Sequence, residues 1–250
     1  MRATYLAGNW KMHKTIPEAV ALAEELKNTL NGSNHKIMIA PPFTALQSVA
    51  EVLKDSNILL GAQNMAGEEQ GAHTGEISIL MLEDIGVDVV IIGHSERRLV
   101  YEESDELINK KVKLALSHGM DLILCVGETL EQREKGKAGE VVKSQLLSGL
   151  NDVKSNDLSH VTIAYEPVWA IGTGKTATPE DADDMHKSIR ETLTALYSQS
   201  EADSMVIQYG GSVKPANVKD LMAKENIDGA LVGGASLSAE KFVPIVQFDK

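Results

Sequence analysis

Short apolar segments alternate with longer amphipathic segments along this whole chain, and that alternation constrains the fold more than any other feature. Several short segments are apolar on both faces, which is typical of parallel strands buried beneath helices. In the first longer segment, Ala19, Leu22, Leu26 and Leu30 recur at helical spacing. The predicted strands are residues 3–7, 37–40, 58–62, 87–92, 122–126, 161–165, 205–209 and 230–232.

Eight strand–helix units in 250 residues favour a single α/β domain over residues 1–250, a closed (β/α)8 barrel with eight parallel strands. A doubly wound open sheet is the alternative, because alternation alone does not decide closure. Two helix starts are also predicted, one at Thr178-Pro179 with Thr178 as N-cap and one with Asp105 as N-cap.

The formal net charge of −12 makes nucleic acid and anionic membranes poor partners. It also opposes an anionic substrate, so a phosphate site would need local dipoles and nearby cations. Cys125 is the single cysteine, so no internal disulfide is expected, and we expect a buried apolar role for it. Without a signal-peptide or membrane-spanning pattern, the sequence predicts a cytoplasmic protein.

Polar residues and glycines gather where the predicted strands end, and in a barrel those ends form one face that carries the active site. Glu166 ends the sixth strand and precedes Pro167, a rigid and partly dry setting suited to a general base. His94 precedes Ser95, which could begin a helix, and the amides of a helix start favour a neutral imidazole.

Lys11, with Asn9 beside it, would supply a local cation at the first strand end. Glycine lets backbone N–H groups approach an oxyanion closely, and barrels often bind phosphate after strands seven and eight. The predicted cradle contains Gly172, Gly210, Gly211, Ser212, Gly233 and Gly234. Together these groups favour proton abstraction from a small phosphorylated substrate.

Other functions fit the sequence less well. The glycines at 172 and 174 match a dinucleotide fingerprint only partly, because six residues separate them from the strand, and a P-loop lacks its first glycine. Two-carboxylate glycosidase chemistry is disfavoured by the low aromatic content of 4%. Histidines without ligand spacing predict no metal. An aldolase-type lyase and a non-catalytic phosphate binder remain open alternatives.

The chain resembles the triosephosphate isomerase family over essentially its whole length. The segments that carry the resemblance are residues 8–12, 93–98, 125–128, 164–176, 209–213 and 231–234, and the Tyr-Glu-Pro-Val-Trp-Ala-Ile-Gly-Thr-Gly run is the most specific. The resemblance implies a TIM barrel that interconverts dihydroxyacetone phosphate and D-glyceraldehyde 3-phosphate through an enediolate, without a cofactor, in glycolysis and gluconeogenesis.

The same resemblance implies roles for single residues. Glu166 would be the base, His94 the electrophile and proton shuttle, and Lys11 the positive charge. Asn9 would help to position these groups, Glu96 would orient the Lys11–His94 region, and Gly172, Ser212, Gly233 and Gly234 would hold the phosphate. The implied lid consists of Pro167, Val168, Trp169, Ala170, Ile171, Gly172, Thr173, Gly174, Lys175 and Thr176.

Residues 63–78 form an unusually long predicted connection, which favours a functional loop. In the family this loop, here Thr74, Gly75 and Glu76, enters a second subunit and implies a homodimer. His73 stands where many relatives carry Phe or Tyr, so the packing of the loop is expected to differ here.

Overall fold

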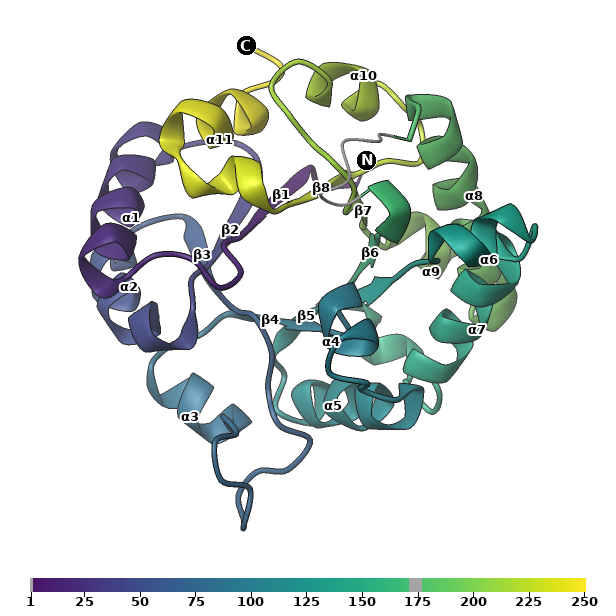
Figure 1. The fold of residues 1–250 in the computed structure, drawn as a ribbon, viewed down its shortest axis with the longest axis horizontal. Helices are drawn as coiled ribbons and strands as arrows, with labels where there is room; N and C mark the ends of the chain where they lie inside the picture. Colours follow the sequence, from purple (N-terminus) through teal and green to yellow (C-terminus); the bar gives the residue numbers. More distant parts are fainter. Residues whose placement is uncertain (1, 171–176) are drawn as a thin grey trace.

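The computed structural model describes residues 2–170 and 177–250, and in them eight parallel strands close into a barrel in sequence order (Figure 1). The predicted TIM barrel is therefore confirmed, and the doubly wound alternative is wrong. The strands are β1 (Tyr5–Asn9), β2 (Lys36–Ala40), β3 (Ile58–Ala62), β4 (Val89–Ile92), β5 (Asp121–Val126), β6 (Val161–Tyr165), β7 (Ile207–Tyr209) and β8 (Gly229–Val232).

The α-helices form a ring outside the barrel (Figure 1). They are α1 (Ile16–Leu30), α2 (Leu46–Leu53), α3 (Ile79–Asp84), α4 (Ser95–Leu99), α5 (Asp105–Ser117), α6 (Leu130–Glu134), α7 (Ala138–Gly149), α8 (Pro179–Leu196), α9 (Gln199–Ser204), α10 (Val218–Met222) and α11 (Ala239–Val246). Short 3-10 turns η1 (Phe43–Ala45), η2 (Ser155–His160), η3 (Val168–Ala170) and η4 (Gly234–Leu237) supplement them.

The barrel closes between its first and last strands. Tyr5 of β1 pairs with Lys36 of β2 on one side and with Gly229 of β8 on the other. A Cβ atom on Gly229 would lie 1.9 Å from the carbonyl oxygen of Tyr5, so only glycine permits this approach. Closure gathers the carboxyl ends of all eight strands at one mouth, which is where the site lies.

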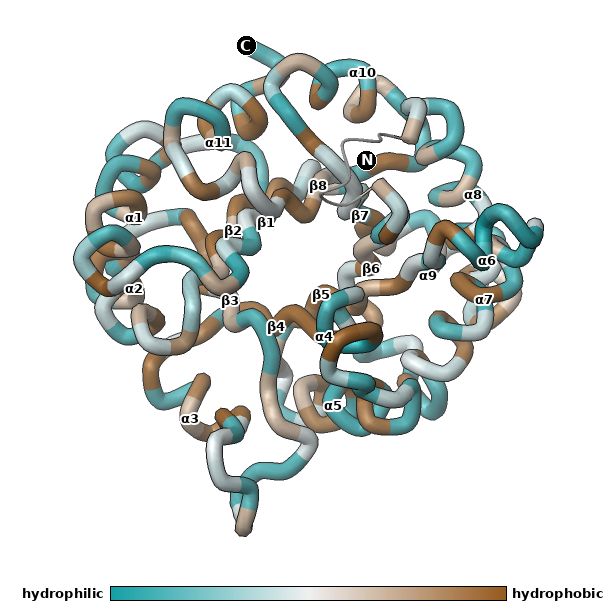
Figure 2. The backbone as a smooth tube through the Cα atoms, viewed as in Figure 1, coloured by the Kyte–Doolittle hydropathy of each residue, from teal (hydrophilic) through white to brown (hydrophobic). Residues whose placement is uncertain are grey.

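Two buried clusters follow the alternation of side chains along each strand. In β1, Tyr5 and Ala7 belong to a small cluster that fills the barrel, whereas Leu6 belongs to a large one between barrel and helices. Figure 2 shows apolar residues concentrated along the strands and the inner sides of the helices. Cys125 lies in the barrel cluster, fully buried and unpaired, as predicted.

One predicted helix start is confirmed and one is wrong. Thr178 caps α8, and its hydroxyl accepts a bond from the Asp181 N–H at 3.0 Å, with Pro179 at the first helical position. Ser104, not Asp105, caps α5, and its hydroxyl accepts from the Leu107 N–H at 3.2 Å. Asp105 is instead the first residue of that helix, where its charge complements the helix dipole.

Candidate active site

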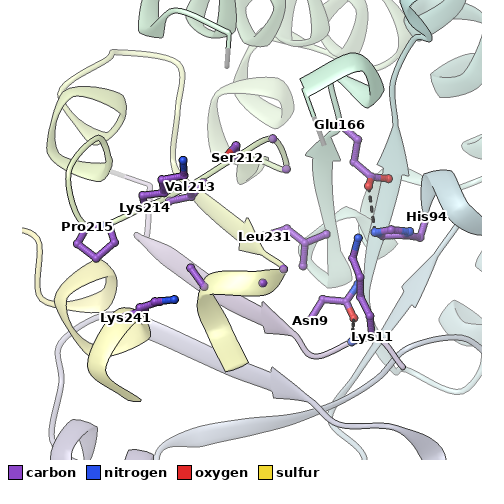
Figure 3. Close-up of a pocket in the computed structure, with 15 residues that line it drawn as sticks. Asn9, Lys11, His94, Glu166, Ser212, Val213, Lys214, Pro215, Leu231 and Lys241 are labelled. Atoms are coloured by element: carbon purple, nitrogen blue, oxygen red, sulfur yellow. Dashed lines mark hydrogen bonds and ion pairs between the residues drawn. The ribbon is translucent and has the colours of Figure 1, made fainter. Parts of the chain in front are cut away.

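A cavity of about 570 Å³ opens at the mouth of the barrel (Figure 3). Its walls come from the ends of β1 and β8, from the segments that follow β1, β4, β6, β7 and β8, and from α11, so residues distant in sequence share one space. The lining residues are Asn9, Lys11, His94, Glu166, Gly210, Gly211, Ser212, Val213, Lys214, Pro215, Leu231, Gly233, Gly234, Ala235 and Lys241.

Glu166 follows β6 directly and is 2% exposed. Its Oε2 accepts the Ser95 N–H at 2.8 Å, and its Oε1 accepts the Ser95 hydroxyl at 3.0 Å. The backbone of Glu166 also lies against Gly127, where a Cβ would come within 1.8 Å of the Glu166 carbonyl oxygen. The carboxylate is therefore dry, oriented and placed at the cavity wall.

His94 is the N-cap of α4 and is 6% exposed. Its Nδ1 accepts the N–H of Glu96 at 3.2 Å, so the ring proton of the neutral imidazole is on Nε2. His94 Nε2 lies 3.0 Å from Glu166 Oε1 (Figure 3). A base and a neutral hydrogen-bond donor thus stand side by side in one cavity.

Lys11 has a left-handed backbone, with φ of 52°. Its N–H donates to Asn9 Oδ1 at 3.0 Å, and its carbonyl accepts from Gln63 Nε2 at 2.8 Å. These bonds hold a conformation that is uncommon for residues other than glycine. They fix the stem from which the Lys11 ammonium reaches into the cavity.

The Lys11 ammonium lies 2.7 Å from Glu96 Oε1. Partial burial raises the pKa of the Glu96 carboxyl, but the Lys11 bond, with the nearby charges, outweighs burial and the net pKa is lowered. Glu96 itself is exposed and does not line the cavity. It acts on the cavity through Lys11 and through its N–H bond to His94.

The glycine turns after β7 and β8 form the opposite wall. Gly210, Gly211 and Ser212 follow β7, and Gly233 and Gly234 follow β8. A Cβ on Gly233 would lie 3.4 Å from Lys11 Cε, so the second turn faces the lysine directly. Backbone exposed in this way, next to a cation, suits a small oxyanion.

The segment after Glu166 is anchored to Glu128, which is fully buried two residues after the end of β5. Glu128 Oε1 accepts the Tyr165 hydroxyl at 3.0 Å and the Trp169 indole N–H at 2.9 Å. The backbone N–H of Val168 also donates to the Glu128 carbonyl at 3.1 Å. Residues 167–170 of the predicted lid are thereby tied to the barrel.

The structure brings together most of the residues that the sequence predicted for the site. Asn9, Lys11, His94, Glu166, Ser212, Gly233 and Gly234 line the same cavity. The predicted lid and phosphate residues Ile171, Gly172, Thr173, Gly174, Lys175 and Thr176 lie outside the described residues. Thr74, Gly75 and Glu76 are exposed on the long loop and do not line the cavity.

Sequence reasoning missed three contributors to the site. Ser95 binds the carboxylate of Glu166 through two groups, although the sequence suggested only a helix start there. Gln63 fixes Lys11, and its place at the end of β3 was the available signal. Lys241 reaches the cavity from α11, and no spacing in the sequence pointed to it.

Neither a metal-binding cluster nor a membrane-crossing helix is found in the part of the chain that the structure describes. Within residues 2–170 and 177–250, no group of three or more His, Cys, Asp or Glu side chains is arranged to hold a metal ion. Among the same residues, no helix has both the length and the apolar character that crossing a membrane requires.

The fold and the cavity define a (β/α)8-barrel enzyme suited to moving protons on a small anionic substrate. A model of the triosephosphate isomerase family matches residues 4–249. The chain is 60% identical over 250 residues to the triosephosphate isomerase of Treponema denticola, covering 100% of both chains. It is 56% identical to that of Treponema pallidum over 247 residues, 99% of each chain. With that of Caldanaerobacter subterraneus subsp. tengcongensis it shares 56% over 248 residues, 99% of this chain and 100% of the relative.

The chain belongs to the triosephosphate isomerase family. Its reaction is the interconversion of dihydroxyacetone phosphate and glyceraldehyde 3-phosphate, a glycolytic isomerisation.

Proposed function

We propose that Glu166 and His94 carry out the proton transfers of this isomerisation. The observation that supports the proposal is the 3.0 Å distance between Glu166 Oε1 and His94 Nε2 inside one cavity. Glu166 removes a proton from the carbon next to the substrate carbonyl, while the Nε2–H of His94 donates to the carbonyl oxygen. Glu166 then returns its proton to the neighbouring carbon.

The resulting enediolate carries negative charge that needs donors already in place. Lys11 supplies an ammonium that Glu96 orients at 2.7 Å, and Asn9 lies beside it on the cavity wall. His94 passes protons between the two substrate oxygens as the neutral imidazole, which its bond from the Glu96 N–H favours. The base, the electrophile and the cation are all side chains of this chain, so the proposed chemistry uses no cofactor or metal.

The phosphate is assigned to the glycine turns after β7 and β8. Ser212, Gly233 and Gly234 lie on the wall that faces Lys11, where backbone N–H groups can approach an oxyanion. Gly172 and the implied lid residues 171–176 complete this assignment from the family resemblance alone.

Replacing Glu166 tests the assignment of the base. The Glu166→Gln variant keeps the shape but removes the proton acceptor, so kcat should fall by at least about 10²-fold. A coupled assay from dihydroxyacetone phosphate, with a chelator present and no nucleotide, measures this. Glu134→Gln, at an exposed position on α6, is the matched control and should keep wild-type kcat. Near-normal turnover of Glu166→Gln would refute the assignment.

We also propose a homodimer in which the loop at Thr74, Gly75 and Glu76 enters the partner. The loop projects away from the barrel beside α3 (Figure 1). Large apolar side chains are exposed elsewhere, including Met12 (91%) and Val100 (69%), and such surface is typical of an interface. Sedimentation equilibrium should give twice the chain mass, and Val100→Asp should shift it towards the monomer.

The chain is proposed to act as a single catalytic domain, residues 1–250, in the cytoplasm. The family model spans nearly all of it, and the one cysteine is buried and unpaired, as suits a reducing compartment. Besides the second copy of the chain, the proposed partner is the triose phosphate, with neither nucleic acid nor membrane, in keeping with the net charge of −12. Recovery of the activity in a membrane fraction would contradict the location.

A further inference from the structure

The cavity continues past the groups that the proposed reaction uses. Its outer wall is formed by Lys214 and Pro215 after β7 and by Lys241 in the first turn of α11. In Figure 3, Lys214 and Lys241 lie on the side of the cavity opposite to Glu166 and His94. Two ammonium groups therefore border the cavity on the side of the glycine turns.

The charge of the cavity is divided unevenly between its two sides. At the inner side, Lys11 is paired with Glu96 at 2.7 Å, and Glu166 adds a second carboxylate. Neither Lys214 nor Lys241 forms a salt bridge with any residue that the structure describes. The inner groups thus carry one net negative charge, and the outer lysines supply positive charge that no carboxylate in the described part of the chain pairs with.

The position of Lys241 in its helix is electrostatically unfavourable. Helix α11 begins at Ala239, so Lys241 lies in the first turn, where the helix dipole disfavours cations and favours acids such as the neighbouring Glu240. Lys241 is also exposed, and within residues 2–170 and 177–250 it forms no ion pair that would offset this cost. Helix stability therefore does not account for a lysine at this position.

We propose that Lys241, with Lys214 as a weaker contributor, captures the phosphate group of the substrate and directs it to the glycine turns. This inference rests on the proposed assignment of Ser212, Gly233 and Gly234 to the phosphate. A chain of net charge −12 repels a phosphate dianion at long range. Local cations at the cavity entrance reverse that field within about one Debye length, roughly 8 Å at physiological salt.

Lys241 does not touch the reacting carbons in this scheme, so its effect lies in association and not in proton transfer. Removing its charge should lower kcat/KM and leave kcat nearly unchanged. The effect should also depend on salt, since screening weakens attraction at the entrance. A residue that merely supported the fold would produce neither pattern.

The first experiment compares three variants with the wild type using glyceraldehyde 3-phosphate at low ionic strength. Lys241→Gln should lower kcat/KM about fivefold, and the difference should shrink as salt is added. Lys241→Arg keeps the charge and should retain the wild-type value. Lys143→Gln removes the same charge from an exposed position on α7, far from the cavity, and should leave kcat/KM within about a factor of 1.5.

The second experiment separates phosphate recognition from every other effect. Inorganic phosphate should inhibit the wild type competitively, and its inhibition constant should rise about fivefold in Lys241→Gln but not in Lys143→Gln. Turnover of glyceraldehyde, which lacks the phosphate, should be the same in all variants.

Two results would overturn the inference in distinguishable ways. If phosphate competes in the wild type but its inhibition constant is the same in Lys241→Gln as in Lys143→Gln, the proposed role of Lys241 is wrong and the glycine-turn assignment stands. If phosphate does not compete in the wild type, the phosphate assignment itself is wrong and the inference falls with it. If Lys241→Gln lowers kcat/KM as much with glyceraldehyde as with glyceraldehyde 3-phosphate, the effect is structural and the inference is also overturned.

Discussion

Lys11 Nζ lies 2.7 Å from Glu96 Oε1, an ion pair that joins the loop after β1 to the first turn of α4 at the mouth of the barrel. The backbone N–H of the same Glu96 donates to His94 Nδ1 at 3.2 Å. One residue thus orients the cation through its side chain and sets the tautomer of the electrophile through its backbone. The N–H bond survives any side-chain replacement, whereas the carboxylate acts on Lys11 directly and has its other oxygen 3.6 Å from His94 Nδ1.

We therefore expect Glu96→Gln to lower kcat by about tenfold. A neutral amide holds the ammonium less tightly than a carboxylate does, and a hydrogen bond to a charged group contributes about 1.5–3 kcal/mol. Steady-state kinetics with dihydroxyacetone phosphate would measure the loss. Glu140→Gln, an exposed change on α7, provides the control. An unchanged kcat would show that Lys11 needs no partner.

Glu128 should be a major contributor to stability because it accepts bonds from three donors while fully buried. Replacing it by alanine leaves the Tyr165 hydroxyl, the Trp169 indole and Arg133 NH1 without this acceptor. We expect Glu128→Ala to lower the free energy of unfolding by about 3 kcal/mol. Urea denaturation followed by tryptophan fluorescence measures it, and a loss below about 1 kcal/mol would contradict the structural role.

His186 should make the protein less stable in acid. Burial lowers the pKa of His186 to about 3, and the Arg190 guanidinium adds to this, although the bond to the Asn226 carbonyl opposes it. The unfolded chain binds a proton near pH 6.5 and the folded protein does not, so stability falls as the pH drops from about 6.5 towards 3.

The role of His186 is tested by how steeply the free energy of unfolding changes with pH, not by its value at any one pH. Urea denaturation at several pH values between 7 and 4 gives the free energy of unfolding at each pH. This free energy should fall less steeply with acid in His186→Gln than in the wild type, whatever the stability of the variant at neutral pH. Equal slopes would mean that His186 does not contribute to the acid sensitivity.

The eight strands could be predicted from sequence because strands buried on both faces leave a continuous apolar run, whereas the closure of the sheet did not follow from this pattern alone. Strand ends were less exact, since backbone pairing and not hydropathy decides them. Residues 3–7 were predicted, yet β1 spans Tyr5–Asn9 because its ladder continues to the pair Asn9↔Ala40. Met205 was assigned to a strand but follows α9 as its C-cap.

The catalytic residues could be predicted where an ionisable side chain lies at a strand end, as for Glu166, His94 and Lys11. Contacts that form only when the barrel closes could not be predicted. Ser95 and Glu166 are joined by hydrogen bonds although they are far apart in sequence, and Lys241 reaches the cavity from the final helix. Similarly, Lys111 looks like a surface helix residue but is 2% exposed and pairs with the buried Glu103 at 2.7 Å.

A double-mutant cycle tests most directly whether Glu166 and His94 act together on one substrate. The kcat values of Glu166→Gln, His94→Gln and the double variant are compared with the wild type. Groups that act as a unit are strongly non-additive. We therefore predict that each single change costs at least about 10²-fold and that the double variant is within about tenfold of the slower single one. Fully additive losses, or a near-normal rate in either single variant, would contradict the account.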